Sequence, residues 1–180
     1  MSKGRLEGKN VVISGGAAGA GGAASEVFAR EGGHVAIVDV QEKVGINLAE
    51  RICENQGKAF FVKGDVSLAE EVEKAVAKIN TEFSNHIDVL FNHAGTVIVK
   101  PFLETTESEW DWMMNVNVKS MFLMTHAVLP SMLANGGAIV NTSSISAVAG
   151  TPMEVLYCTS KGACHMFTRA IATEFRDKGI

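Results

Sequence analysis

The chain has 180 residues, 47% of them hydrophobic and 20% charged, which is ordinary globular composition for a single domain over residues 1–180. Its formal net charge is −4, and it contains no run of basic residues. This acidic balance argues against nucleic acid or an anionic membrane surface as a partner.

Short apolar runs alternate with longer amphipathic stretches along the chain. Runs such as NVVIS, VAIVD and AIVNT are nearly continuous instead of alternating, which is typical of parallel strands covered by helices on both faces. The sequence predicts an α/β fold whose parallel strands lie at residues 10–14, 34–39, 59–62, 87–92 and 138–142.

The segment SGGAAGAGG, residues 14–22, lies between the first predicted strand and the first predicted helix. Gly15, Gly19 and Gly21, with Ala20 among them, stand where the backbone must turn tightly and approach a pyrophosphate at the helix N-terminus. Their spacing is Gly-x-x-x-Gly-x-Gly, and the Gly-Lys-Ser/Thr sequence of a Walker phosphate loop is absent. A glycine-rich turn without a ligand is the alternative interpretation.

Asp39 ends the second predicted strand, 24 residues after Gly15. An acidic side chain there can accept hydrogen bonds from the adenosine ribose hydroxyls of NAD and would repel the 2′-phosphate of NADP. Neither Ala18 nor Val40 offers a cation for that phosphate, so NAD is the expected cofactor and NADP the less favoured one. A solvated carboxylate at a strand end is the alternative.

Two later helices have sequence signals for their starts. Residues 106–109 (TESE) and 151–154 (TPME) both match the capping-box pattern. We expect these helices over residues 107–134 and 152–178, the second ended by Gly179.

The second of these helices carries the only tyrosine of the chain, Tyr157, one turn before Lys161. Residues four apart share a helix face, so the phenol and the ammonium can act as a unit. An isolated Tyr-x-x-x-Lys pair is more often a plain surface feature, and its context must decide.

The cysteines (Cys53, Cys158 and Cys164) and the five histidines have no metal-ligand spacing, so we expect no metal site. Few cysteines fit a reducing compartment. The stretch 11–24 is too glycine-rich for a signal peptide, and no apolar run reaches membrane-spanning length. These features predict a cytoplasmic protein.

Six segments in the predicted strand and helix contexts form one ordered set: the glycine loop, Asp65-Val66, NHAG (92–95), Asn117, NTSS (141–144) and YCTSK (157–161). Together they resemble the classical short-chain dehydrogenase/reductase (SDR) family over nearly the whole chain. The resemblance implies a Rossmann-type doubly wound parallel sheet and an NAD(P)-dependent enzyme acting on CH–OH groups. Ser14 and His93 are mild departures, since Thr and Asn are usual there, and we expect His93 to be a hydrogen-bonded structural residue.

The resemblance also implies roles for residues around the cofactor. Asp65 and Val66 would hold the adenine, and Lys161 would bind the nicotinamide ribose. The cofactor's ribose would be flanked by Asn92, Ala94 and Gly95.

In enzymes of this family the tyrosine is the acid/base, so the resemblance implies this role for Tyr157, with the Lys161 ammonium favouring its phenolate. An ammonium at about 4 Å contributes about 4 kcal/mol at an effective dielectric near 20, but about 1 kcal/mol in open water, so the site must be partly closed. Ser144 would hold the substrate oxygen and Asn117 would anchor a water in a proton relay. Ser143, Ser146 and Asn115 are the neighbouring alternatives; Ser144, 13 residues before Tyr157, has the family's usual placement.

Members of the family continue into a sixth strand, a loop that covers the substrate and a seventh strand, so the resemblance implies a fold truncated after the helix that follows strand 5. They commonly dimerise through the two long helices, here 107–134 and 152–178, and we expect a homodimer. The residues near the catalytic end are mostly apolar and favour a hydrophobic alcohol: Thr96, Val97, Ala147, Val148, Met153 and Val155.

The leading hypothesis is an NAD-dependent oxidoreductase that transfers a hydride between nicotinamide and a secondary alcohol or ketone. The alternative is an NAD-binding module or fragment impaired in catalysis, with a role in binding or assembly. A nucleotide-sugar epimerase shares Tyr-x-x-x-Lys but would usually need a larger substrate domain.

Overall fold

A parallel five-stranded sheet forms the centre of the computed structural model, which describes residues 4–180. Its strands are β1 (Asn10–Ser14), β2 (His34–Asp39), β3 (Lys58–Lys63), β4 (Val89–Asn92) and β5 (Ala138–Asn141). Their order is β3-β2-β1-β4-β5, so the chain winds outward from β1 to β3, returns to the centre and winds outward again. The predicted doubly wound parallel sheet is confirmed.

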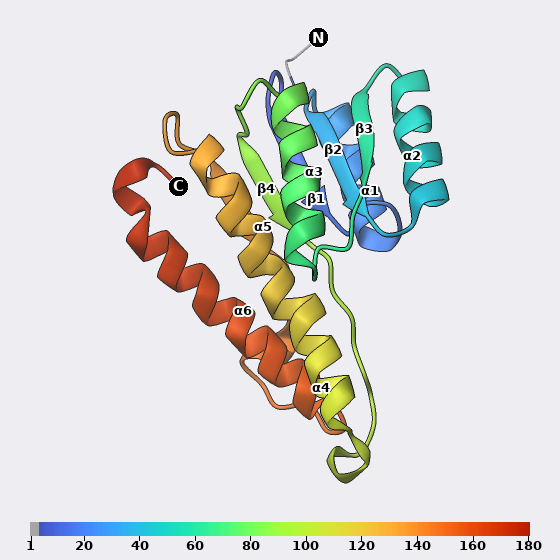
Figure 1. The fold of residues 1–180 in the computed structure, drawn as a ribbon, viewed down its shortest axis with the longest axis vertical. Coiled ribbons are helices and arrows are strands. Elements are labelled where there is room, and N and C mark those ends of the chain that lie inside the picture. Colours follow the sequence, from blue (N-terminus) through green and yellow to red (C-terminus); the bar gives the residue numbers. More distant parts are fainter. Residues whose placement is uncertain (1–3) are drawn as a thin grey trace.

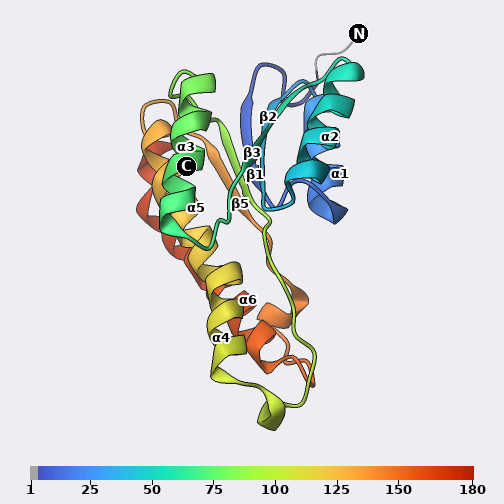
Figure 2. The same cartoon turned by 45° about the vertical axis from the view of Figure 1, so that its right-hand side comes forward.

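Helices cover both faces of this sheet, as Figures 1 and 2 show. The helices are α1 (Gly19–Arg30), α2 (Glu42–Glu54), α3 (Ala69–Glu82), α4 (Glu107–Met114), α5 (Ser120–Val128) and α6 (Val155–Glu174). Helices α1 and α2 pack on one face, and α3 and α5 pack on the other. This is the three-layer arrangement expected when parallel strands are joined by helical crossovers.

The strand cores are apolar on both sides because both faces are covered. In β1, Val11 and Ile13 point into the layer of α1 and α2, whereas Val12 points into the layer of α3 and α5. All three side chains are fully buried. This explains why the strands appear in the sequence as nearly continuous Val/Ile runs.

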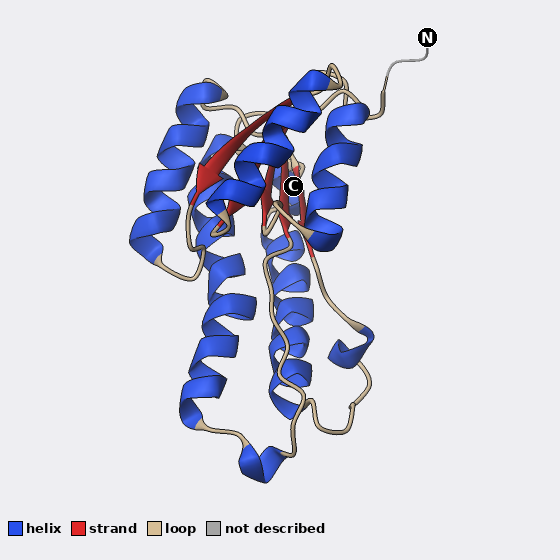
Figure 3. Cartoon of the chain, turned by 90° about the vertical axis from the view of Figure 1, so that its right-hand side faces the viewer, coloured by secondary structure: helices blue, strands red, loops and turns tan. Residues whose placement is uncertain are grey.

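The helix predicted over residues 107–134 is a composite. It begins with the predicted capping box, in which the Thr106 hydroxyl accepts from the N–H of Glu109 while the Glu109 carboxylate accepts from the N–H of Thr106. A π-helical segment, Asn115–Lys119, joins α4 to α5, and a 3-10 turn, Leu129–Ser131, follows α5. We call this composite helix, residues 107–131, the rod; it ends at Ser131 instead of 134. Figure 3 shows this rod and α6 extending side by side beyond the sheet.

The predicted start and end of the last helix, 152 and 178, are wrong. Met153 has φ +64, a left-handed conformation that an α-helix cannot include, so the helix begins at Val155 after Glu154, which makes no side-chain cap. The helix ends at Glu174, and a 3-10 turn, Arg176–Lys178, precedes Gly179 at φ +72. Tyr157 and Lys161 nevertheless lie in the first two turns of α6, as predicted.

The predicted strand bounds differ from the observed ones by at most two residues. The largest difference is at β4, which begins at Val89 instead of 87, because Asp88 turns its carboxylate to the Lys9 ammonium (2.7 Å) and the N–H of Asn10 (2.8 Å). Within residues 4–180, no helix is both long enough and apolar enough to cross a membrane.

Candidate nucleotide-binding and catalytic site

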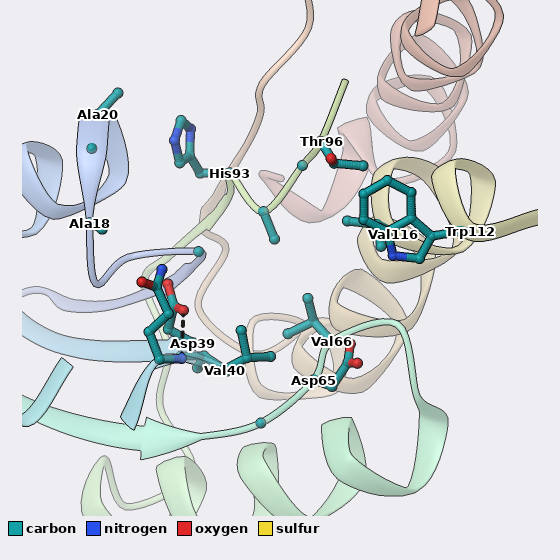
Figure 4. A pocket seen from close by; sticks show the side chains of 17 residues that line it. Ala18, Ala20, Asp39, Val40, Asp65, Val66, His93, Thr96, Trp112 and Val116 are labelled. Atoms are coloured by element: carbon teal, nitrogen blue, oxygen red, sulfur yellow. Dashed lines mark hydrogen bonds between the residues drawn. The ribbon is translucent and has the colours of Figure 1, made fainter. Parts of the chain in front are cut away.

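A cavity of about 480 Å³ opens at the carboxyl ends of the strands, between β1 and β4. At this point the strand order changes direction, because the chain continues from β1 to β2 on one side and from β4 to β5 on the other. Ligands of open α/β sheets bind at such switch points, and the volume is within the usual range for small-molecule sites. Figure 4 shows the cavity and its lining side chains. Eight of the predicted cofactor residues line it: Gly15, Gly19, Ala20, Asp39, Asp65, Val66, Ala94 and Gly95.

The glycine loop forms one wall of the cavity with bare backbone. Gly15 has φ +68, and a Cβ added to it would lie 2.7 Å from the Cα of Ala94. A Cβ on Gly21 would collide with the carbonyl oxygen of Gly15, so this buried glycine shapes the loop from behind the lining. The first N–H groups of α1, which begins at Gly19, have no acceptor within the helix and can receive an anion.

Asp39 joins the glycine loop to the end of β2. Its carboxylate accepts hydrogen bonds from the N–H of Ala17 (3.1 Å) and the N–H of Gln41 (3.0 Å), and the residue is only 8% exposed. The side chain lines the cavity, where Figure 4 shows it beside Val40. The carboxylate is thus fixed in place and contributes negative charge to this wall.

The loops after β3 and at β4 contribute the next part of the site. The Asp65 carboxylate accepts from the N–H (2.9 Å) and the hydroxyl (2.7 Å) of Ser67, which fixes the turn that presents Val66 to the cavity. Asn92 lies below the lining: its amide donates to the Asn141 amide oxygen (2.8 Å) and to the Thr125 hydroxyl (3.1 Å).

The segment after β4 is held by side chains at the ends of the two neighbouring strands, Ser14 in β1 and Thr142 directly after β5. The Ser14 hydroxyl accepts from the N–H of His93 (3.2 Å) and the N–H of Ala94 (3.4 Å). The His93 ring nitrogen Nδ1 lies 2.9 Å from the Thr142 hydroxyl, so the ring is hydrogen-bonded as predicted. Burial lowers the pKa of His93, and the positive charge of Lys161 lowers it further, so the neutral imidazole is favoured.

Lys161 and Tyr157 lie next to this segment. The Lys161 ammonium is 5.7 Å from the centroid of the Tyr157 ring and donates to the Thr142 carbonyl at 2.8 Å. A Cβ placed on Gly95 would lie 3.5 Å from Lys161 Nζ, which sets the ammonium beside the cavity lining. Lys161 is 4% exposed, and this burial lowers its pKa because it disfavours the charged form.

Asn117, in the π-helical segment, connects the rod to two other parts of the site. Its amide accepts from the N–H of Thr96 (2.7 Å) and donates to the Thr96 carbonyl (2.9 Å) and the Ser160 hydroxyl (2.9 Å). Its own carbonyl accepts from the Cys164 thiol at 3.2 Å. Single π-helical turns inside α-helices are frequent at functional sites, and here the turn carries the residue that ties the β4 loop to α6.

Ser144 begins a short 3-10 turn, Ile145–Ala147, that packs against α6. Its hydroxyl accepts from the N–H of Ser146 at 3.1 Å. The Ser146 hydroxyl lies within 3.2 Å of the Thr151 hydroxyl and is buried, whereas Ser143 is exposed. Of the three serines, Ser146 is therefore the one most engaged in holding its own loop.

Sequence reasoning missed several parts of this site. Thr142 acts on Lys161 through a main-chain carbonyl, which leaves no signal in the sequence. Trp112 and Val116 line the cavity from the rod, although a Trp and a Val on a helix indicate core or subunit contact at least as readily. Within residues 4–180, no group of three or more His, Cys, Asp or Glu side chains is placed to hold a metal ion.

A parallel sheet with a glycine-rich first turn, an acidic end of β2 and a cavity at the switch point is typical of dinucleotide-binding α/β proteins. The family model described as "short chain dehydrogenase" matches residues 9–180. The chain belongs to the short-chain dehydrogenase family.

Curated relatives and solved structures agree with this assignment. The chain is 40% identical over 172 residues to a cyclopentanol dehydrogenase of a Comamonas species, covering 95% of this chain and 68% of that protein. It is 34% identical over 173 residues to an NAD-dependent glycerol dehydrogenase of Listeria innocua, covering 96% of this chain and 66% of that one. A crystal structure of a short-chain dehydrogenase from Mycobacterium smegmatis superimposes with a TM-score of 0.92 at 28% identity, covering 98% of this chain and 75% of that one.

Proposed function

We propose that this chain carries the cofactor site and the catalytic residues of an NAD-dependent oxidoreductase that interconverts a secondary alcohol and a ketone. The observation that carries this proposal is the buried Lys161 ammonium, 5.7 Å from the Tyr157 ring and adjacent to Gly95 in the cavity lining. A poorly screened cation beside a phenol favours the phenolate, which can take a proton from an alcohol. The position of this Tyr157–Lys161 pair beside the proposed dinucleotide cavity supports a reaction in which the alcohol loses a hydride and a proton together.

The residues present fit a dinucleotide. Bare backbone at Gly15 and Gly21 leaves the space that a Cβ would fill, and the N-terminus of α1 faces it with free N–H groups. The Asp39 carboxylate would receive the adenosine ribose hydroxyls, and Asp65 and Val66 would border the adenine. When bound, the nicotinamide ring supplies the hydride acceptor or donor.

The chain's own groups supply the proton chemistry. In the oxidation direction, the Tyr157 oxygen takes the hydroxyl proton of the alcohol while the Lys161 ammonium stabilises the phenolate. The Ser144 hydroxyl would hold the substrate oxygen. Asn117 fixes Thr96 and Ser160 around the pair, and its role in a proton relay through water stays a prediction.

Apolar side chains near the catalytic end support a hydrophobic substrate. Val97, Val148 and Met153 lie outside α6 and Val155 is its first residue, and each of the four is at least 42% exposed. The Comamonas relative is named for cyclopentanol, a cyclic secondary alcohol, and this favours the same substrate class. Phe122 and Met166, which are exposed on the two long helices, support the expected homodimer. The three cysteines are free thiols, which fits the expected cytoplasmic location.

Turnover of cyclic and acyclic secondary alcohols, followed as NADH formation beside a calorimetric titration with NADH, tests the proposed function. We expect saturable NADH binding together with turnover of at least one apolar secondary alcohol. NADH binding without turnover of any alcohol or ketone would favour the alternative, a binding module impaired in catalysis. Absence of NADH binding would contradict both.

Cofactor choice gives a second test, at Asp39. Because its fixed carboxylate would repel a 2′-phosphate, NADH should bind at least about tenfold more tightly than NADPH, a difference of about 1.4 kcal/mol. Asp39→Asn should reduce this difference between the NADH and NADPH affinities, because it removes the charge while keeping an acceptor for the N–H of either Ala17 or Gln41. Glu42→Gln, which removes an exposed carboxylate outside the cavity lining, is the matched control. Equal affinities of the unmutated protein for the two cofactors would refute the assignment.

A further inference from the structure

Trp112 lines the cavity from the rod, and no part of the proposed function uses it. It lies four residues before Val116, so the two side chains share one helix face, and both line the cavity. Figure 4 shows this pair across the cavity from Ala18 and Asp39. Trp110, two positions earlier, points elsewhere and is not part of the lining.

Trp112 presents an uncovered aromatic surface at the cavity. Half of the residue, 50%, is exposed to solvent, compared with 38% for Trp110. An indole offers a large, flat, apolar surface, and leaving half of it in water at the edge of a cavity forgoes the gain from burying it. A flat aromatic ring is the ligand that best covers such a surface, because offset stacking matches its shape and its charge distribution.

The residues at the two ends of the cavity that Trp112 lines indicate which ring this is. The lining next to the β2 and β3 ends consists of Val40, Asp65 and Val66, beyond the carboxylate of Asp39. The opposite end of the site is bounded by Gly95, which faces the Lys161 ammonium. If the dinucleotide runs between them, its adenine lies on the side of Val66 and its nicotinamide on the side of Lys161.

We propose that Trp112 is an aromatic wall of the adenine subsite, against which the adenine ring packs when the dinucleotide binds. This inference rests on the proposed function, because it takes the cavity as the site of NAD. It adds a binding residue from a helix that otherwise serves the catalytic end. The rod would thus contact both ends of the cofactor, with Trp112 at the adenine and Asn117 near the nicotinamide.

The affinity for NADH tests the proposal without any assay of turnover. Calorimetry should give an NADH dissociation constant about tenfold weaker for Trp112→Ala and within about threefold of the unmutated value for Trp112→Phe, which keeps an aromatic face. Trp110→Ala, the matched control on the same helix, should leave the affinity unchanged. Equal NADH affinities of Trp112→Ala, Trp110→Ala and the unmutated protein would overturn the inference.

Fluorescence tests the same contact without altering position 112. The chain has two tryptophans, so Trp110→Phe leaves Trp112 as the only indole emitter. AMP should quench this emission saturably, and nicotinamide mononucleotide should not. Quenching by nicotinamide mononucleotide but not by AMP would overturn the assignment to adenine.

The controls separate this inference from the proposed function. An unmutated protein that binds no NADH would overturn the proposed function and this inference with it. NADH binding that Trp112→Ala leaves intact, while light scattering shows lost self-association, would overturn only the inference and would make Trp112 a subunit contact.

Discussion

Turnover by the Tyr157→Phe variant is expected to fall by about 10²- to 10⁴-fold, while its affinity for NADH changes by less than about twofold. The substitution removes the hydroxyl that we propose exchanges a proton with the substrate oxygen, and general acid/base catalysis contributes a factor of this size. The ring remains, so its packing beside the Lys161 ammonium, 5.7 Å from its centroid, is retained. Initial rates of NADH formation and a calorimetric titration with NADH measure the two effects separately.

Thr159→Val is the matched control for this substitution. It removes a hydroxyl from the same helix, two residues further on, where the side chain is exposed and donates to the Val155 carbonyl at 2.8 Å. Its turnover should stay close to that of the unmutated protein. If Tyr157→Phe also kept its turnover in a protein shown to be active, Tyr157 would not be the acid/base.

Lys161→Met is expected to lower turnover by about 100-fold and also to weaken NADH binding. A unit charge 5.7 Å from the phenol ring contributes about 3 kcal/mol to the phenolate at an effective dielectric near 20, and methionine removes it while keeping a similar length. The nicotinamide ribose would lose the ammonium as a partner as well. Rates and NADH affinity of Lys161→Met, measured beside the exposed-site control Lys78→Met, test this expectation.

Stability should respond in a different way from turnover. Burial lowers the pKa of Lys161, so the folded state holds its proton less readily than the unfolded chain does. The resulting destabilisation is fully present below the lowered pKa and is relieved as the pH rises from there to the ordinary pKa of lysine. Lys161→Met removes this cost but leaves the Thr142 carbonyl without its donor, so its Tm should lie within a few degrees of the unmutated value. A Tm loss large enough to explain the lost turnover would contradict an electrostatic role for Lys161.

The strands and the glycine loop could be predicted because their signals are local. An apolar run such as residues 35–38 is typical of a strand covered on both faces, and Gly15 follows the first strand directly. The order of the strands does not follow from such runs, since it is set by long-range crossovers, and the family resemblance implied only that the sheet is doubly wound. The family match over residues 9–180 agrees with that expectation.

The π-helical segment could not be predicted from burial spacing. Buried residues recur at Met113, Asn117 and Met121, and a spacing of four is compatible with an α-helix as well as with a π turn. The capping-box pattern at residues 151–154 wrongly predicted a helix start at 152, because a long-range contact sets the backbone there. It matches a capping box in residue types, but Met153 has a positive φ and its carbonyl accepts from the N–H of Lys100 at 2.8 Å, a long-range contact.

The hydrogen bonds of Asn117 have a consequence for local unfolding. The amide joins the segment after β4, the rod and the first turns of α6, three parts that are far apart in the sequence. If one part opened alone, a buried amide would lose its partners, at a cost of about 1–3 kcal/mol for each unsatisfied group. The three parts therefore open as one cooperative unit and do not fray separately. Amide hydrogens at Thr96 and in the first turns of α6 would then exchange with solvent at similar rates, so that the segment after β4 and the helix turns that carry Tyr157 and Lys161 have the same lifetime in the folded protein.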